Sequence, residues 1–333
     1  MIYYPLLDII RYLAAFIVAS SHFFLVQSNK PILEFISSIS VEVFFVLSGF
    51  VLANQINLII KRRFRYCDIW VFFVRRWVRT MPSYFIAIFI TAFVFDAVDF
   101  YNVLRHLLYI QNFISDNPSP NFFSVGWSLS IEEWFYILFP LTMLVFYKTI
   151  KEVDKLYLYV SFGIISLSIL LRYFIGSEEA WGEDVRRSVI FRLDAIVFGY
   201  LAYSFKYISN KNSTLFFVLL LPIFLLTMYL FSLDFLNKNY QNLFFILCGL
   251  FFSISLIFFS KVSIHFRGRS ALLFNFLSKL SYPIYLFHLV FIPFFSVNNN
   301  YLLYIVALNI FAIVFHYGFE YQILKLRPKY KEI

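Results

Sequence analysis

Charged residues are scarce in this chain. Only 14% of its 333 residues are Asp, Glu, Lys or Arg, whereas a typical soluble domain has about a quarter. Hydrophobic residues make up 61% of the sequence, and its mean hydropathy is +0.77. This composition excludes an ordinary soluble domain and predicts an all-α, polytopic membrane protein.

Cysteine is scarce as well, with only two residues in the chain. Cys67 falls in a basic loop and Cys248 in an apolar segment, and two such residues offer neither a disulfide framework nor a metal site. The sequence shows no internal repeat, no low-complexity linker and no second soluble domain, so we expect a single transmembrane domain over residues 1–333. The first apolar segment is too long for a signal-peptide core and lacks a small-residue cleavage site. We therefore expect no cleavable signal peptide.

Long apolar segments are what the chain has instead. A membrane-spanning helix needs about 20 apolar residues, and the sequence predicts about ten such helices. Their approximate ranges are 6–27, 36–60, 80–98, 132–147, 156–175, 189–207, 214–232, 241–260, 275–296 and 301–324.

The excess of basic residues indicates topology. The net charge is +9, which taken alone would suggest a nucleic-acid partner. However, nineteen Lys and Arg residues lie in the two ends and the loops on one side of the predicted spans, and only five lie in the alternate loops. Positive residues mark the cytoplasmic side. We therefore expect both termini in the cytoplasm, membrane lipids as partners and no nucleic acid.

The first span, LLDIIRYLAAFIVASSHFFLV (residues 6–26), carries Asp8, Arg11 and His22. Arg11 and His22 share one helical face, about 16 Å apart along the axis, and Asp8 lies one turn before Arg11. Ionisable groups inside a span suggest function by default. The alternative is an Asp8–Arg11 pair that holds the helix end, together with a hydrogen-bonded His22 at the interface.

Two arginines of FFVRRWVRTMPSYF (72–85) lie on one helical face at the inner membrane surface. Arg76 and Arg79 are three residues apart, and arginines so placed can grip phosphate in bidentate fashion. Pro82 then marks a kink or the start of a span. The alternative is ordinary positive-inside anchoring.

Two adjacent acids of WSLSIEEWFYILFP (127–140) enter the fourth span from outside. Ser130 and Glu133 have the spacing of a capping box, which would give Glu133 a structural role. Glu132 has no capping role and is the better functional candidate.

The other polar residues predicted in the outer half of the membrane are Glu42, Arg172, Arg192, Asp194 and His288. The alternative for Arg192 and Asp194 is that they neutralise charges on neighbouring helices, Glu42 among them, and the alternative for His288 is a packing role. Ser48 and Gly49 of SGF indicate close helix packing. The remaining histidines, which we assign to no site, are His106, His265 and His316.

Six motifs occur here in the order of one known family. LDIIRYLAAFIVASSHF, VEVFFVLSGFVL, FFVRRWVRTMPSY, WSLSIEEWFYILFP, FRLDAIVFGYLA and SYPIYLFH resemble successive motifs of the acyltransferase family 3 integral-membrane O-acyltransferases. The resemblance covers about residues 6–324. It implies a ten-helix enzyme of the bacterial inner membrane that moves an acyl group, usually acetyl from cytoplasmic acetyl-CoA, to a hydroxyl of an envelope carbohydrate. Because the chain ends at Ile333, we expect a stand-alone form without an appended hydrolase-like domain.

The resemblance also implies roles for particular residues. The family's Arg-x10-His motif falls on Arg11 and His22, and its Arg-x-x-Arg motif, associated with acyl-CoA, on Arg76 and Arg79. A third motif falls on Trp127, Ser128 and Glu132, and Glu42 stands where an aspartate is common. We expect catalytic roles for His22, Glu132 and Arg11. The substrate-binding candidates are Arg76, Arg79, Asp8, Glu42, Trp127, Ser128, Arg192, Asp194 and His288.

The predicted mechanism has His22 as general base on a sugar hydroxyl, with Glu132 orienting its ring or stabilising the imidazolium. A transient acyl-enzyme on His22 is the variant. Acetyl-CoA would be a substrate, and we expect no bound cofactor or metal. The acceptor stays open among O-antigen, capsule, exopolysaccharide, peptidoglycan and small glycosides, with loops 99–126 and 176–188 as the segments expected to choose it. The alternative function is a transporter of an anion or a lipid-linked sugar, against which stands the lack of an inverted repeat.

Overall fold

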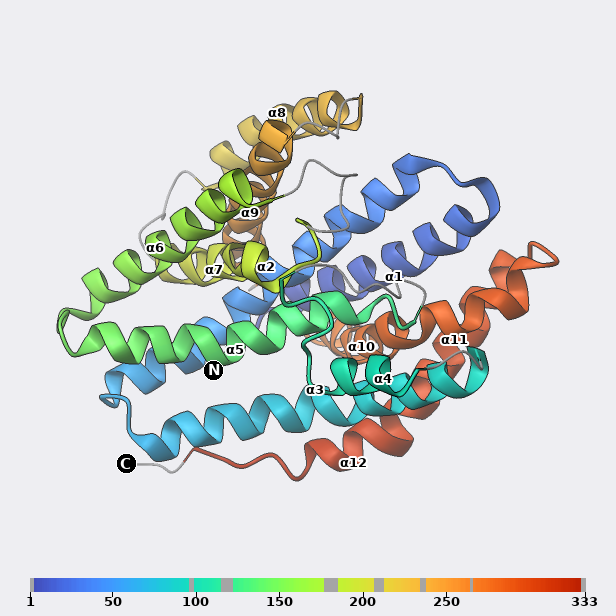
Figure 1. Cartoon of the computed structure of the whole chain (residues 1–333), viewed down its shortest axis with the longest axis horizontal. Helices are drawn as coiled ribbons and strands as arrows, with labels where there is room; N and C mark the ends of the chain where they lie inside the picture. The colour runs from blue at the N-terminus through green and yellow to red at the C-terminus, as the bar shows by residue number, and fades with distance from the viewer. Residues whose placement is uncertain are drawn as a thin grey trace. The chain divides into compact units, whose positions relative to one another are not determined.

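The computed structural model describes residues 3–95, 99–114, 122–176, 185–206, 213–233, 238–263 and 266–330. Over these residues the regular structure is helical, and no strand occurs (Figure 1). Parts of the two loops expected to choose the acceptor, residues 115–121 and 177–184, lie outside the described residues, as does His265. The helices are α1 (Pro5–Ser28), α2 (Pro31–Lys61), α3 (Tyr66–Phe95), α4 (Phe100–Leu107), α5 (Gly126–Tyr147), α6 (Val153–Phe174), α7 (Val189–Phe205), α8 (Ser213–Leu233), α9 (Lys238–Val262), α10 (Arg269–Ser296), α11 (Tyr301–Phe315), the π-helix η2 (His316–Glu320) and α12 (Tyr321–Leu324).

The long helices match the predicted spans. Nine spans coincide with one helix each, and the last coincides with the continuous run of α11, η2 and α12. Within the part of the chain that the structure describes, eight helices are long and apolar enough to cross a membrane. The chain is therefore a polytopic, all-α membrane protein, as predicted from its composition. The cytoplasmic position of both termini stays a prediction.

Several helices begin earlier than predicted, and the early starts of α3 and α5 bear on the site. α3 begins at Tyr66 rather than near residue 80, so Pro82 lies inside the helix and does not start the span. The segment from 66 to 80 contains no Gly or Pro, and its arginines are good helix formers; hydropathy alone, however, counts them against a helix in the membrane. α5 begins at Gly126 rather than near 132.

The early start of α5 overturns the predicted capping box. Val125 is the N-cap residue, so Ser130 lies inside the helix and cannot cap it. The Ser130 hydroxyl instead donates to the Gly126 carbonyl and accepts a hydrogen bond from Gln111. The structural role predicted for Glu133 as a capping partner is therefore wrong.

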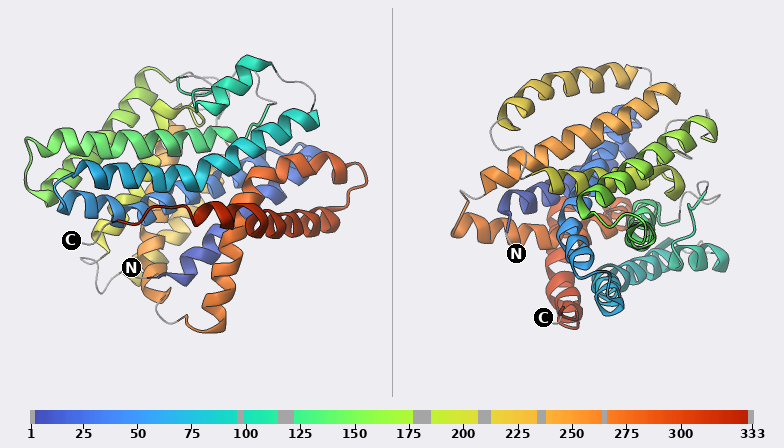
Figure 2. Two further views of the ribbon diagram at one scale, coloured as in Figure 1. Left: turned by 90° about the horizontal axis from the view of Figure 1, so that it is seen from below. Right: turned by 90° about the vertical axis from the view of Figure 1, so that its left-hand side faces the viewer.

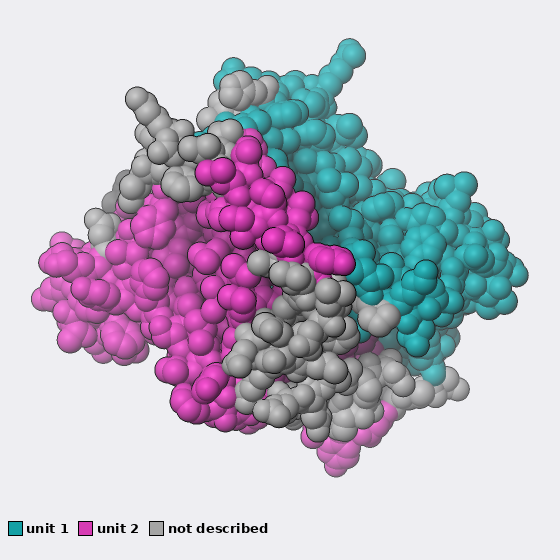
Figure 3. All heavy atoms as spheres, turned by 90° about the horizontal axis from the view of Figure 1, so that it is seen from above, with its two compact units in different colours: residues 1–44, 77–98, 259–327 teal, residues 45–76, 99–258, 328–333 magenta. Residues whose placement is uncertain are grey.

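The chain divides into two compact units (Figure 3). Unit 1 contains residues 1–44, 77–98 and 259–327, and unit 2 contains residues 45–76, 99–258 and 328–333. The divisions fall inside α2, α3 and α9, so these helices contribute to both units. The single domain expected over 1–333 stays a prediction.

Unit 1 joins helices that are distant in sequence, whereas unit 2 also packs consecutive helices. In unit 1, α1 packs along α10, and α10 packs on α11 (Figures 1 and 2). This brings the first and last parts of the chain together. In unit 2, α5, α6 and α7 pack against one another.

Two glycines of unit 2 allow α2 and α7 to cross closely. A Cβ atom on Gly49 would lie 1.8 Å from the Ile196 carbonyl oxygen, and one on Gly199 would lie 1.8 Å from the Val46 carbonyl oxygen. Only glycine fits where two backbones approach this closely. The predicted packing at Gly49 is confirmed, and its neighbour Ser48 is thereby aimed at another helix, α5.

Candidate functional site

A chain of hydrogen bonds in unit 1 joins His22 on α1 to His288 on α10. His22 Nδ1 lies 2.7 Å from His288 Nε2, and the two rings are stacked. His288 Nδ1 lies 2.8 Å from the Tyr285 carbonyl oxygen, and Ser37 Oγ on α2 lies 3.2 Å from His22 Nε2. The structure thus brings His22 together with His288, which the sequence placed at the same depth without pairing them.

The backbone carbonyl of Tyr285, at the end of this series of hydrogen bonds, determines which ring nitrogens of His288 and His22 carry protons. The Tyr285 carbonyl can only accept, so His288 Nδ1 carries a proton and its Nε2, in the neutral ring, accepts from His22 Nδ1–H. A neutral His22 then has its lone pair on Nε2, where the Ser37 hydroxyl can donate. His288 is fully buried. The arrangement is that of a base oriented by a second group, and a residue first weighed as a packing histidine fixes the tautomer of His22.

Glu132 in unit 2 is held through both of its carboxylate oxygens. Ser48 donates to Oε1 at 2.7 Å, and Tyr136, one turn further along α5, donates to Oε2 at 2.9 Å. The close crossing of α2 and α7 at Gly49 positions the Ser48 hydroxyl. Since His22 and Glu132 belong to different units, their predicted pairing stays a prediction.

The start of α5 is fixed by the segment before it. Asn112 donates to the Trp127 carbonyl at 3.0 Å, and Ser128 donates to the Val125 carbonyl at 3.2 Å. The Trp127 ring packs edge-on against Phe45, and the Arg186 guanidinium lies over it, 5.6 Å from its centroid. Trp127 and Ser128 are thus held firmly beside Glu132, while their substrate roles stay predictions.

Asp194 on α7 takes part in a buried ion pair. Arg172 on α6 and Asp194 on α7 are 2.8 Å apart and each is 1% exposed. The remaining Arg172 donors reach the Asn242 side chain and the Phe191 carbonyl. The Arg192 guanidinium stacks over Phe245, 3.7 Å from the ring centroid. These contacts support the structural alternative for Asp194, and the substrate roles of Arg192, Asp194 and the buried Glu42 stay predictions.

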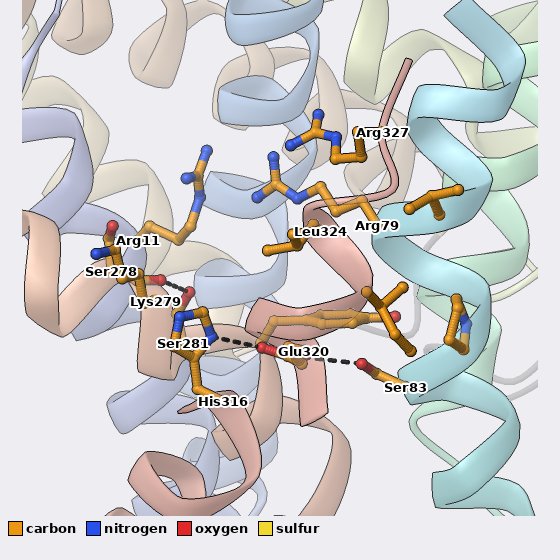
Figure 4. A pocket seen from close by; sticks show the side chains of 14 residues that line it. Arg11, Arg79, Ser83, Ser278, Lys279, Ser281, His316, Glu320, Leu324 and Arg327 are labelled. Carbon is orange, nitrogen blue, oxygen red and sulfur yellow. Dashed lines mark hydrogen bonds and ion pairs between the residues drawn. The ribbon is translucent and has the colours of Figure 1, made fainter. Parts of the chain in front are cut away.

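A cation-lined pocket occurs in unit 1 (Figure 4). Arg11 from α1, Arg79 from α3, Lys279 from α10 and Arg327 after α12 line a cavity of about 130 Å³. Asp8 lies 3.8 Å from Arg11, as the one-turn spacing predicted. Four cations around one cavity suit an anionic ligand.

Arg76 and Arg79 have different surroundings. Arg79 lines the pocket, whereas Arg76 is buried in unit 2 with its guanidinium over the rings of Phe72 and Tyr136. That both arginines grip one phosphate stays a prediction. Several other pocket residues were not predicted from the sequence, because they lie on helices that are distant in the chain. These residues are Ser83, Lys279, His316, Glu320 and Arg327. The one available sign was the spacing of His316 and Glu320, which are four residues apart and therefore share a helical face.

Comparisons with known proteins agree with this picture. The profile of one family, described as an acyltransferase domain, matches residues 4–320. The peptidoglycan O-acetyltransferase OatA of Listeria monocytogenes is 31% identical over 209 residues, which cover 55% of this chain and 32% of the relative. A Staphylococcus aureus (strain COL) protein that carries an O-acetyltransferase name is 25% identical over 296 residues, which cover 77% of this chain and 46% of the relative.

A protein of Haemophilus influenzae without an assigned activity is 27% identical over 221 residues, which cover 60% of this chain and 87% of that protein. No solved structure matches the chain. The chain spans less than half the length of the Listeria and Staphylococcus relatives. The family profile, however, matches nearly all of it, over residues that include the histidine pair, the Glu132 site and the cationic pocket apart from its lining residues beyond Glu320. The chain therefore belongs to the family of acyltransferase domains.

Proposed function

We propose that the protein is an O-acetyltransferase of the bacterial inner membrane that moves acetyl from acetyl-CoA to a hydroxyl of an envelope carbohydrate. The acceptor class is a cell-surface polysaccharide or lipid-linked glycan, such as O-antigen, capsule or exopolysaccharide. The observation that carries the proposal is the chain from Tyr285 through His288 to His22, which presents a basic nitrogen to a hydroxyl. The O-acetyltransferase names of two relatives support it.

In the proposed reaction His22 Nε2 takes the proton of the acceptor hydroxyl. The contact with Ser37 Oγ indicates that an O–H group can lie against this nitrogen. The acceptor oxygen attacks the thioester carbonyl, the C–O bond forms, the C–S bond breaks, and the sulfur leaves as thiolate. Glu132 is the proposed carboxylate that stabilises the His22 imidazolium while the charge is present.

The donor is proposed to bind through its phosphates in the cationic pocket. Arg79 offers a planar fork of donors that matches phosphate geometry, and Arg11 lines the same cavity. Removing one charge-assisted contact costs about 1.5–3 kcal/mol, so Arg79→Ala should weaken acetyl-CoA binding by roughly tenfold to a hundredfold. Arg79→Lys should restore it only in part. Equal donor affinities for Arg79→Ala and the wild type would make Arg79 a topological anchor.

The decisive experiment is mass spectrometry of envelope glycans from cells with and without the gene. We expect an acetyl increment that disappears without the gene and returns with the wild-type chain but not with His22→Ala. Asn309→Leu, which removes a hydrogen bond between Tyr12 and α11 away from the histidines, is the control and should restore acetylation. Identical glycans with and without the gene would contradict the proposed function, and acetylation by His22→Ala would remove the general base.

A further inference from the structure

A further histidine, His316, lines the cationic pocket, and one of its ring nitrogens has no hydrogen-bond partner among the residues that the structure describes. His316 Nδ1 lies 2.8 Å from Glu320 Oε2, and Ser83 on α3 donates to Glu320 Oε1 at 2.9 Å (Figure 4). The side chain of His316 is 4% exposed, and its Nε2 is buried without a hydrogen-bond partner among the described residues. A buried polar atom left unsatisfied costs about 1–3 kcal/mol and requires an explanation.

The backbone that holds this pair departs from the α-helix. Residues His316–Glu320 form the π-helical turn η2 between α11 and α12, and such turns inside α-helices occur frequently at functional sites. The sequence HYGFE supplies Gly318, at which a side chain would meet nothing within 4 Å, so packing at Gly318 does not force the turn. The turn places a histidine and its carboxylate on the wall of the pocket.

The charges around the ring select the class of ligand. Figure 4 shows the guanidinium groups of Arg11, Arg79 and Arg327 on one side of the pocket and the chain of His316, Glu320 and Ser83 on another. Lys279 lines the same cavity. Four cations and one further N–H donor on the wall of one cavity suit an anion with several acceptor oxygens, which describes a phosphoryl group.

We infer that His316 donates a hydrogen bond from Nε2 to a phosphoryl group bound in this pocket, with Glu320 fixing the ring and Ser83 fixing Glu320. Glu320 accepts a hydrogen bond from Nδ1–H of His316, so Nε2 can donate only when it also carries a proton. The identity of the ligand as the acetyl-CoA donor rests on the proposed function. The phosphoryl site itself rests on the pocket, the orphaned nitrogen and the two hydrogen bonds that orient it.

The charged groups that line the pocket are Glu320 on the same turn, Arg11 on α1, Arg79 on α3, Lys279 on α10 and Arg327 after α12. Four of these five groups are cations, so the pocket favours an anionic ligand.

The test is titration calorimetry of the full chain in detergent with 3′-dephospho-coenzyme A, whose diphosphate bridge does not ionise between pH 6 and 8. At pH 6 we expect His316→Ala to bind about tenfold more weakly than the wild type, as for a lost charge-assisted hydrogen bond. Glu320→Gln should give a smaller loss. Asn309→Leu, on the preceding helix and outside the pocket, is the matched control and should behave as the wild type.

Parallel titrations identify which phosphate is bound and whether its source is the donor or a lipid. A His316-dependent affinity for coenzyme A that is absent with 3′-dephospho-coenzyme A assigns the ring to the 3′-phosphate. Competition by phosphatidylglycerol nanodiscs, but not by phosphatidylcholine ones, assigns the site to a lipid headgroup. Unchanged affinity of His316→Ala for every probe would overturn the inference and leave a structural His316–Glu320 pair. Because binding is measured without acetyl transfer, a protein that binds phosphate through His316 but acetylates nothing would contradict only the proposed function.

Discussion

Residue by residue, the described histidines differ in what their second ring nitrogen contacts. His22 and His288 share a hydrogen bond, His316 turns one nitrogen to Glu320 and the other toward a pocket, and His106 bonds a backbone carbonyl. That His22 and His288 both lie in the outer half of the membrane stays a prediction, which rests on hydropathy and loop charge. The sequence could not predict their contact, which depends on how α1 packs along α10. For the same reason it left His316 without a role.

The two adjacent glutamates should respond differently to loss of charge. Glu132→Gln keeps the size of the side chain but loses the charge proposed to stabilise protonated His22, so we expect a large fall in acetyl turnover at normal protein level. Glu133 is 3% exposed and has lost its predicted capping role, so Glu133→Gln should change thermal stability more than turnover. Initial rates and unfolding temperatures of both variants provide the comparison. Wild-type turnover in Glu132→Gln would exclude the pairing of Glu132 with His22.

Acidification should loosen the segment that contains α4. Burial lowers the pKa of His106 to about 4, against the opposing effect of its hydrogen bond to the Asn102 carbonyl. An unfolded histidine titrates near 6.5, so between pH 6.5 and 4 the unfolded segment binds more protons and the folded one loses stability. From pH 7 to pH 5 the loss is about 2 kcal/mol. Hydrogen exchange over residues 99–114, corrected for intrinsic rates, should show this opening.

The matched variant for this pH effect is His106→Leu, which removes the titrating group and leaves a side chain that can still pack against Phe122 and Phe123. Its exchange should not respond to pH over the same interval. The same pH response in both proteins would mean that another group controls the segment.

For the elements, composition predicted the positions of the helices better than their ends. Apolar segments marked ten helices, but α3 continues through a basic segment and α5 starts at Gly126, because helix propensity and contacts from the preceding loop extend both beyond the apolar core. Because α5 begins before its predicted start, Ser130 lies inside the helix and the predicted capping box does not form. The π-helical turn at His316 had no sequence pattern that hydropathy could detect.

The crossing of α2 and α7 should tolerate no side chain at Gly49. Gly49→Ala would place a Cβ atom against the Ile196 carbonyl, and overpacking of this kind costs about 1–3 kcal/mol. We expect a lower unfolding temperature and, because Ser48 moves with its neighbour, a lower turnover. Gly163→Ala on α6 is the control, since its Cβ would meet nothing within 4 Å; it should unfold at the wild-type temperature or slightly above. Equal unfolding temperatures for both variants would show that the two helices are not held this closely.

For the whole molecule, the sequence predicted what depends on sums over many residues and missed what depends on single packed contacts. The membrane class and the all-α fold follow from average hydropathy, and the family follows from six ordered motifs. The division into two units, with boundaries inside α2, α3 and α9, has no counterpart in composition or linkers. It assigns Arg76 and Arg79, which one motif groups, to different units, and likewise His22 and Glu132, which the predicted mechanism pairs.

Orientation in the membrane is the property of the whole chain on which the proposed reaction depends. Loop charges place Cys67, which is exposed beside Arg65, in the cytoplasm, and they place Tyr101, which is 69% exposed on α4, outside. A membrane-impermeant maleimide should therefore label Cys67 in lysed but not in intact spheroplasts. In a variant that combines Cys67→Ser with Tyr101→Cys, it should label intact spheroplasts as well. The buried Cys248 should contribute little background, because thiol reactivity requires access. Labelling of Cys67 in intact spheroplasts would show that the arginine-rich side faces outward. Arg79 could then not bind acetyl-CoA from the cytoplasm, and the proposed donor site would be contradicted.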